Sequence, residues 1–377
     1  MNNALKLALT GLLLFCSTAW ATPNTKHDRV LIVEALNNYI QGTSFSNKEQ
    51  ISSAFYRQAN LYLEKKAQTL WTVPIAEYLS WYKNENKGVS NGRVGEIISI
   101  DIAGHIATAK AEILIPKDNS RFVDMFLLKK LAGKWQILSK SAIRTKSQAN
   151  AERVLFIVSN AHFHGDSKLP AGVSFSEIVK AYDAFKLAGY TVDMVSPKGG
   201  AIPLSYINTS ETIHKKYLYN SDFMYALAHT KSPAQVNSKD YRAVHYIGGS
   251  NAMYGVADNK AIQDIVMSVY EDHNGIISSV CHGTAGIVNL KTKSGEYLVT
   301  GKKVSGYPDS FENQSKAYFK QFPFLIQQTI EQRGGTFIHA ERNQAHVEVD
   351  GRIVTGQNHL SSRLVAEQII SMLKTQS

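Results

Sequence analysis

The sequence has few cysteines, few charged residues and no long apolar run, and each scarcity excludes a class of protein. Only two cysteines occur in 377 residues, which excludes a scaffold held together by disulfides. Charged residues make up 19% and there is no low-complexity tract, which excludes coiled-coil and collagen-like chains. Hydrophobic residues reach 44%, so a large core is available. At roughly 150 residues per domain, this length indicates two domains or one large one.

The first 21 residues have the pattern of a secretory signal peptide. Lys6 precedes the apolar stretch Leu7–Phe15, and the small residues Ala19 and Ala21 form an A-x-A cleavage pattern. The apolar stretch is shorter than the roughly 18 residues that span a bilayer. We therefore expect cleavage after Ala21 and a periplasmic or secreted protein without stable membrane insertion. Export also argues against a nucleic-acid partner, although the net charge of +10 would suit one.

A polar stretch at 145–151 separates two regions of different periodicity, and we expect domains at 22–147 and 151–377. The first region begins with apolar residues at helical spacing, from Val30 to Ile40 and again at Ile75 and Tyr78. Strands with alternating apolar residues follow. Helices first and an antiparallel meander afterwards predict an α+β domain in which a curved sheet wraps three helices.

This first domain resembles the SnoaL-like, nuclear-transport-factor-two-like cone fold, close to its lumazine-binding branch, over about residues 25–146. The resemblance rests on element order and hydrophobic positions, without a sharp motif. It implies either a small apolar ligand inside the cone or formation of a homodimer. Trp71, Trp81 and Tyr82 either line such a pocket or, as we expect, pack in the core.

The second domain alternates apolar runs with helical stretches. Four runs are apolar nearly throughout: Val154–Ser159, Val192–Ser196, Ala243–Ile247 and Ile276–Val280. Such runs indicate a parallel sheet covered on both faces, so we expect a doubly wound α/β domain with its ligand at the carboxyl ends of the strands. Hairpins are expected at 298–305 and at 347–355, the latter turning at Asp350–Gly351.

Cys281, the only cysteine beyond the expected signal peptide, follows the run Ile276–Val280 directly and is followed by His282 and Gly283. A strand that turns into a helix at a nucleophile has the geometry of a nucleophile elbow. The start of the helix presents unpaired N–H groups and a partial positive charge, which lower a thiol pKa and can hold an oxyanion. We expect a reactive thiol; the alternative is an inert buried cysteine.

Gly248 and Gly249 end the neighbouring run Ala243–Ile247. Glycines let the backbone approach a ligand closely. We therefore expect the oxyanion hole to be formed by Gly248, Gly249 and the backbone of His282, the alternative for the glycines being an ordinary tight turn.

The second domain closely resembles the DJ/PfpI branch of the class I glutamine amidotransferase-like superfamily, nearest to its heat-shock chaperone and glyoxalase III group. That fold is flavodoxin-like. The likeness rests on several stretches together: Gly189–Gly200, Ile247–Gly249, Val280–Gly283, Gly301–Gly306 and Thr355–Asn358. This sequence departs from the family at Thr284, where proline is usual, and at Ser250–Asn251, where His-Gly is frequent. The departures concern the pocket wall and leave the substrate open.

Position by position, the resemblance implies a set of site residues. Cys281 matches the nucleophile, His282 the histidine that follows it, and Glu177 the acidic residue that approaches the thiol. Glu312 fits the carboxylate that orients the histidine, with Asp309 as a substitute. The implied chemistry needs no cofactor and no metal.

The resemblance implies a glyoxalase III-like lyase that converts a small carbonyl substrate, a 2-oxoaldehyde such as methylglyoxal, to a 2-hydroxy acid, or a related repair of glycation adducts. Two other functions use the same thiol. One is a stress chaperone or oxidation sensor, in which Cys281 is oxidised. The other is a cysteine hydrolase, either a peptidase or an amidase.

Two further histidine patterns have other interpretations. His162 and His164 have H-x-H spacing that suits a metal, but no further ligand is evident, so an ordinary polar loop is expected. His346 and Glu348 resemble the distal pair of glutamine amidotransferases, yet they lie in an expected hairpin and are predicted to form a strand face.

Overall fold

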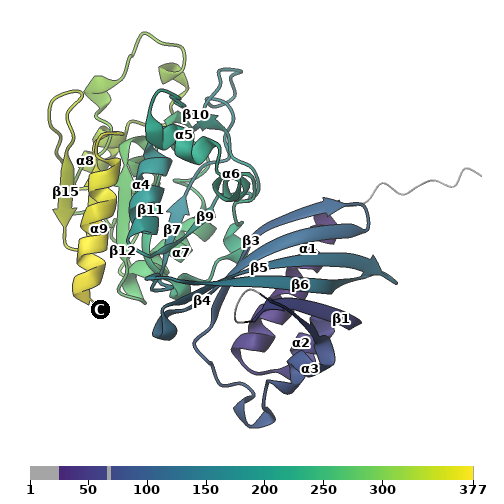
Figure 1. Ribbon diagram of the computed structural model, residues 1–377. Coiled ribbons are helices and arrows are strands. Elements are labelled where there is room, and N and C mark those ends of the chain that lie inside the picture. The colour runs from purple at the N-terminus through teal and green to yellow at the C-terminus, as the bar shows by residue number, and fades with distance from the viewer. Residues whose placement is uncertain (1–24, 66–68, 377) are drawn as a thin grey trace, which may run out of the picture.

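The computed structural model describes residues 25–65 and 69–376, so the expected signal peptide lies outside the described residues. Two sheets with separate cores follow one another along the chain (Figure 1). The last strand of the first sheet ends at Lys146 and the first strand of the second begins at Arg153. None of the helices between residues 25 and 376 combines the length and hydropathy of a membrane span.

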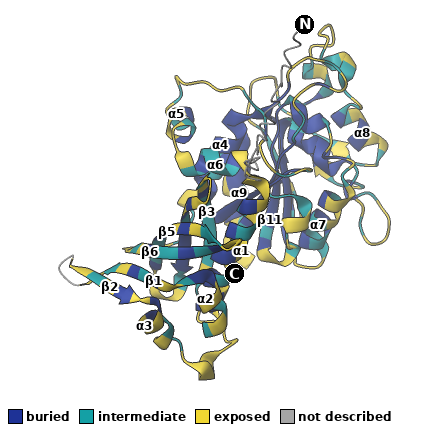
Figure 2. Cartoon of the chain, turned by 90° about the vertical axis from the view of Figure 1, so that its right-hand side faces the viewer, coloured by how far each residue is buried: buried dark blue, intermediate teal, exposed yellow. Residues whose placement is uncertain are grey.

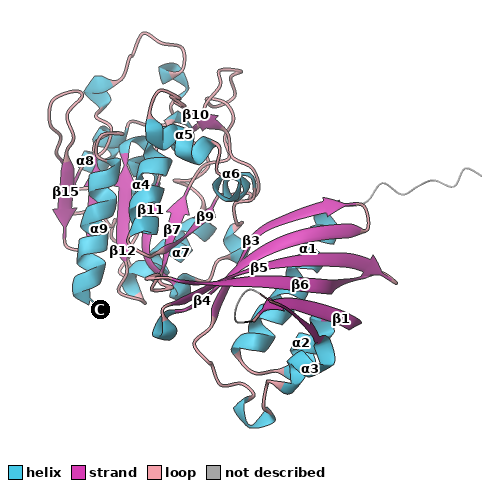
Figure 3. Ribbon diagram, viewed as in Figure 1, coloured by secondary structure: helices cyan, strands magenta, loops and turns pink. Residues whose placement is uncertain are grey.

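The first sheet has six strands in the order β2-β1-β6-β5-β4-β3, and three helices cover one side of it (Figure 3). The helices are α1 (Thr25–Ser44), α2 (Lys48–Ala54) and α3 (Ile75–Ser80). The strands are β1 (Phe55–Glu64), β2 (Leu70–Pro74), β3 (Val94–Ala103), β4 (Ile106–Ile115), β5 (Ser120–Leu131) and β6 (Lys134–Lys146). The domain is the expected α+β cone.

The order of elements in this domain differs from the prediction in one respect. Strands β1 and β2 precede α3, so the three helices do not all come first. The polar residues Arg57, Gln58 and Asn60 interrupt the apolar alternation of β1, which hides the strand in the sequence. β1 pairs in parallel with β6, a contact between residues far apart in the chain.

β5 and β6 form an antiparallel hairpin. Its two turn residues, Ala132 and Gly133, both have positive φ, at 46° and 83°, as a tight type I′ hairpin requires. The alternating alanines of β4 (Ala107, Ala109 and Ala111) are buried in the core. Trp81, by contrast, is 44% exposed and stacks against Trp71 with ring centroids 5.3 Å apart. These two rings lie at the edge of the core rather than inside it.

The second domain contains a six-stranded sheet in the order β15-β16-β12-β11-β7-β9. Its strands are β7 (Arg153–Ile157), β9 (Thr191–Val195), β11 (Tyr241–Tyr246), β12 (Ile276–Val280), β15 (Val347–Asp350) and β16 (Ile353–Gly356). Shorter strands are β8 (Val173–Ser174), β10 (Leu204–Ser205), β13 (Lys303–Val304) and β14 (Thr336–Phe337). All pairs of the large sheet are parallel except β15 with β16. This is the expected flavodoxin-like order.

Helices cover both faces of the second sheet, as predicted for a doubly wound domain (Figure 1). They are α4 (Phe175–Leu187), α5 (Thr212–Leu218), α6 (Ser221–Ala228), α7 (Lys260–Glu271), α8 (Ile326–Gln332) and α9 (Ser362–Gln376). One apolar core lies under α4 and α9 and another under α7. Figure 2 shows the buried residues gathered along the sheet between them.

Of the two hairpins expected in this domain, one is present and one is wrong. β15 and β16 pair in antiparallel fashion around Asp350 and Gly351. Leu298–Thr300, however, forms a turn, and β13 pairs in parallel with β14, more than thirty residues further along the chain. A short apolar run does not reveal a partner that distant.

The two domains meet where β3 and β4 of the first approach α6 and β9 of the second. Ion pairs cross this contact from Arg153 to Glu96 at 3.4 Å and from Lys110 to Asp222 at 2.8 Å. The contact lies at the amino end of β9, whereas Cys281 follows the carboxyl end of β12. The interdomain contact and the candidate site are therefore at opposite ends of the sheet.

Candidate active site

Cys281 lies at a sharp bend between a buried strand and a short helix. All five residues of β12 are buried, and a 3₁₀ helix runs from Cys281 to Ile287. Cys281 has φ of +56° and is 7% exposed. A positive φ is unfavourable for a residue with a side chain and points to a constrained position. Gly283 permits the close approach to β11, since a Cβ there would meet Tyr246 O at 2.5 Å.

Glu177 approaches the thiol from the first turn of α4. Ser174 caps this helix, and its hydroxyl accepts a hydrogen bond from the Glu177 N–H at 3.4 Å. The carboxylate presses against the glycine turn that follows β11: a Cβ on Gly248 would lie 2.4 Å from Glu177 Oε2 and 3.0 Å from Cys281 Cβ. Gly248 thus leaves the space in which the carboxylate and the thiol meet.

Burial raises the pKa of Glu177 to about 7. The side chain is 3% exposed, and in the described part of the chain Oε2 has no hydrogen-bond partner. His282, the Cys281 thiol and the Gly248 N–H lower this pKa only in part. A carboxyl group with a pKa near neutrality can accept and return a proton at physiological pH.

The surroundings of Cys281 differ from the expectation of a lowered thiol pKa. Burial and the negative charge of Glu177 raise the pKa of Cys281, and only the His282 N–H acts in the opposite direction. The short 3₁₀ helix supplies little positive charge to outweigh a carboxylate in contact with the sulfur. Because the pKa of the thiol is raised, its ionisation needs a proton acceptor, and the Glu177 carboxylate in contact with it is the nearest candidate.

His282 links the thiol to Glu312. Its Nδ1 lies 3.5 Å from Cys281 Sγ, and its Nε2 lies 2.7 Å from Glu312 Oε1. Tyr307 stacks on the imidazole with ring centroids 4.6 Å apart and an interplanar angle of 22°. The imidazole is therefore held at three sides, between the sulfur, a carboxylate and an aromatic ring.

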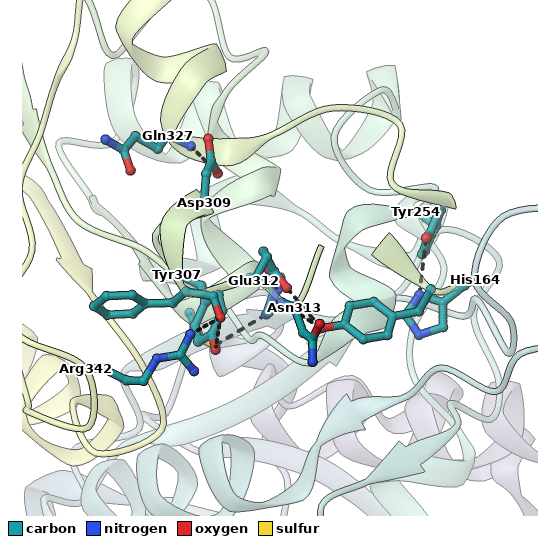
Figure 4. Close-up of polar contacts among 12 residues, drawn as sticks. His164, Tyr254, Tyr307, Asp309, Glu312, Asn313, Gln327 and Arg342 are labelled. Atoms are coloured by element: carbon teal, nitrogen blue, oxygen red, sulfur yellow. Dashed lines mark hydrogen bonds and ion pairs between the residues drawn. The ribbon is translucent and has the colours of Figure 1, made fainter. Parts of the chain in front are cut away.

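Asp309 has a different role from the one proposed for it as a substitute. Its carboxylate accepts hydrogen bonds from the N–H groups of Gln327 and Gln328 at 3.1 and 2.9 Å, at the start of α8. Figure 4 shows Asp309 directed toward Gln327, while Glu312 lies among a separate group of polar contacts. Of the two acids, Glu312 alone bonds to His282.

The predicted oxyanion donors have different neighbours: Gly248 lies against Cys281 and Glu177, whereas Gly249 packs against the backbone of residues 172–174. Gly249 has φ of +108°, and a Cβ there would meet Gly172 O at 2.4 Å, so this position requires glycine. The N–H of Gly248 acts on the Glu177 carboxylate and that of His282 on the Cys281 sulfur. Both of these N–H groups act on the reacting pair, and the oxyanion role of Gly248, Gly249 and His282 stays a prediction.

Comparison with known proteins assigns both halves of the sequence. The model of the DJ-1/PfpI family matches residues 169–372. The chain belongs to the DJ-1/PfpI family. Residues 27–141 match a second family model, described as "Putative lumazine-binding".

Several of the relatives that resemble the DJ-1/PfpI part are named as glyoxalases. Glyoxalase 3 of Candida albicans is 31% identical over 227 residues, which cover 56% of this chain and 93% of that protein. A glutathione-independent glyoxalase of Schizosaccharomyces pombe is 28% identical over 246 residues, or 60% of this chain and 100% of the relative. The crystal structure of glyoxalase III from Candida albicans covers 58% of this chain and 96% of its own, with a TM-score of 0.53 and 29% identity.

The other histidines singled out in the sequence, His346 and the pair His162 and His164, have different surroundings. His346 Nε2 bonds to Glu348 Oε1 at 2.8 Å beside strand β15. His164 is buried and its Nδ1 lies 3.3 Å from the Tyr254 hydroxyl (Figure 4), whereas His162 is exposed. Within residues 25–65 and 69–376, no group of three or more histidine, cysteine or acidic side chains gathers at metal-binding distances.

Two tyrosines of the site were missed by the sequence reasoning. Tyr307 stacks on His282, and the hydroxyl of Tyr318 donates to Glu312 Oε2 at 3.3 Å. Both lie in an irregular segment with many aromatic residues. Tyr307 directly follows the stretch Gly301–Gly306 that was matched to the family, and this position was the available signal; Tyr318 had none.

Proposed function

We propose that this protein is a cysteine-dependent, cofactor-free glyoxalase that converts 2-oxoaldehydes such as methylglyoxal to 2-hydroxy acids without glutathione. The observation that carries the proposal is the contact of a constrained cysteine with a buried carboxyl group of pKa about 7, beside a histidine held by a second carboxylate. The glyoxalase names of the relatives support it.

The first step uses the pair of Glu177 and Cys281. Glu177 takes the thiol proton, and the thiolate adds to the aldehyde carbon to form a hemithioacetal. The alkoxide that forms from the aldehyde oxygen is stabilised by backbone N–H groups of Gly249 and His282. The adduct then takes up a proton at this oxygen, and the carboxyl group returns to its ionised state.

The second step moves hydrogen between the two substrate carbons. A base, Glu177 or His282, removes the proton from the former aldehyde carbon to give an enediol, and the neighbouring carbon receives a proton. The product is a thioester of the 2-hydroxy acid on Cys281. Water attacks the thioester, releases the acid and regenerates the thiol. Carbon oxidation at one position balances reduction at the other, so no external oxidant is needed.

The test is consumption of methylglyoxal in the absence of glutathione, with lactate measured as product. We expect wild-type turnover, and a loss of about a thousandfold or more in Cys281→Ala. Activity that survives in Cys281→Ala would overturn the proposal for this site. Hydrolysis of peptides or of glutamine by the wild-type protein, without lactate formation, would instead support the cysteine hydrolase.

We also propose that the protein acts after export, because its first 21 residues have the composition of a secretory signal. Its substrates would then be small carbonyl compounds outside the cytoplasm. Fractionation of producing cells, followed by mass determination of the mature N-terminus, tests this. We expect a product that begins at Thr22; a full-length cytoplasmic product would contradict it.

A further inference from the structure

Glu312 is anchored at both oxygens although it lies in an irregular segment. Oε1 bonds to His282 Nε2 at 2.7 Å, and Oε2 accepts from the Tyr318 hydroxyl at 3.3 Å. The Glu312 side chain is 7% exposed. A carboxylate at the end of a flexible side chain can turn about its last bond, so a second partner decides how it faces the imidazole.

The donor and acceptor roles of the Tyr318 hydroxyl follow from its second neighbour. The backbone N–H of Asn313 donates to the Tyr318 hydroxyl oxygen at 3.4 Å. A hydroxyl has a single hydrogen, and here it accepts from one group, so its own hydrogen is directed to Glu312. Figure 4 shows Glu312 and Asn313 beside each other on this side of the site.

The ring of Tyr318 is held in place by His164, from a loop between β7 and β8. The two ring centroids are 5.4 Å apart with an interplanar angle of 37°, and His164 is 5% exposed. His164 is itself fixed by Tyr254 at 3.3 Å and by its N–H, which donates to Leu169 O at 2.9 Å. The loop that carries His164 therefore packs against the segment that carries Tyr318.

We propose that Tyr318 is a positioning residue that acts on His282 through Glu312, and that His164 holds the Tyr318 ring for this purpose. Tyr318 fixes the carboxylate, and the carboxylate keeps His282 Nδ1 turned toward Cys281 Sγ, 3.5 Å away. The inference rests on the proposed function for its effect on turnover, but not for its effect on the thiol. It also gives the histidine pattern at 162–164 a role that requires no metal.

The rival explanation is that Tyr318 only fills space. Its ring also contacts Phe322, with centroids 5.7 Å apart. Tyr318→Phe retains the ring and removes only the hydroxyl, so it separates the two explanations. If the hydroxyl acts through Glu312, its removal has no effect once the carboxylate is absent.

The experiment is a double-mutant cycle with Tyr318→Phe, Glu312→Ala and the double variant, with Glu312→Gln as a second background should the alanine variant not fold. Turnover of methylglyoxal and the rate of Cys281 alkylation by iodoacetamide are both measured. We expect Tyr318→Phe to lower kcat about tenfold with KM unchanged, and alkylation about threefold, in the wild-type background. In the Glu312→Ala background we expect no further change in either.

Equal losses in both backgrounds would overturn the inference, and so would wild-type rates in Tyr318→Phe. Because alkylation does not depend on the substrate, it tests the inference even where the wild-type protein fails to convert methylglyoxal. His164→Ala should lower both rates and His164→Phe should restore them, because packing is its role. Tyr219→Phe, at a tyrosine 80% exposed at the end of α5, is the matched control and should change neither.

Discussion

Two acids with almost the same burial, one in each domain, differ in the groups that surround them. Asp28 of the first domain is 2% exposed, and hydrogen bonds from Lys130 at 2.6 Å and Trp135 at 2.9 Å lower its pKa. Glu177 of the second domain is 3% exposed, and burial raises its pKa to about 7. The two acids differ in whether a cation lies beside them. Asp28 forms a salt bridge with Lys130, whereas no lysine or arginine of the described residues forms a salt bridge with Glu177.

This contrast distinguishes charged side chains that stabilise the fold from charged side chains that take part in a reaction. In the first domain Asp124 and Lys140 also form a buried pair at 2.9 Å, and Tyr39 donates to the same carboxylate at 2.6 Å. A buried acid with a cation beside it, such as Asp28, stays ionised near neutral pH because its pKa is lowered. An acid that lacks a cation and contacts a thiol exchanges its proton there.

The largest expected effect is on turnover. Glu177→Gln should lower kcat for methylglyoxal about 10² to 10³-fold, because the thiol then has no proton acceptor of suitable pKa. Asp124→Asn should leave kcat within about twofold at a temperature at which it is folded. A Glu177→Gln variant with wild-type kcat would remove the distinction between the two acids.

The free energy of unfolding should show the opposite pattern, with the larger effect at Asp124 and the smaller at Glu177. Asp124→Asn breaks a buried ion pair and should lower the free energy of unfolding by about 3 kcal/mol, measured by chemical denaturation. The same measurement on Glu177→Gln should show no such loss. A neutral result for Asp124→Asn would mean that the pair contributes nothing to the cone.

The pH dependence of stability gives a finer test. A carboxyl group whose pKa rises from 4.5 to about 7 on folding binds its proton more tightly in the native state. It therefore makes the protein less stable as pH rises through that window, by up to about 3 kcal/mol. Glu177→Gln removes this loss, so it should unfold at higher temperature than wild type at pH 8 and at a similar temperature at pH 4.5. Parallel curves would contradict the raised pKa.

The smallest effect is expected between the domains. Lys110 and Asp222 pair at 2.8 Å across the contact, with side chains 28% and 43% exposed. Solvent screens such a pair, so Lys110→Ala should cost less than about 1 kcal/mol and leave turnover unchanged. A large loss of turnover would show that the first domain influences the site at the far end of the sheet.

Elements whose conformation is determined by neighbouring residues could be predicted from the sequence. The apolar run before Cys281, the glycine turn after β11 and the Asp350–Gly351 hairpin all follow from neighbouring residues. Contacts between distant segments were not predictable in this way, as the parallel pairs β1 with β6 and β13 with β14 show. A short run gives its own conformation but not the identity of its partner.

The candidate site, too, could be predicted from the sequence only in part. The residues that meet at the thiol followed from family motifs, and Glu177, Cys281, His282 and Glu312 do form one connected group. The raised pKa of the Cys281 thiol could not be predicted from the sequence, because it depends on the depth of burial and on the distance to the carboxylate. Tyr318 was also missed, since its relation to Glu312 arises only from the path of an irregular segment.

The most direct test is the pH dependence of Cys281 alkylation by iodoacetamide in wild type and in Glu177→Gln. Transfer of the thiol proton to Glu177 predicts that the wild-type rate rises with a midpoint at about pH 7 and that this rise is absent in Glu177→Gln. A rise at the same pH in both proteins would contradict the account, since the thiol would then ionise without the carboxyl group.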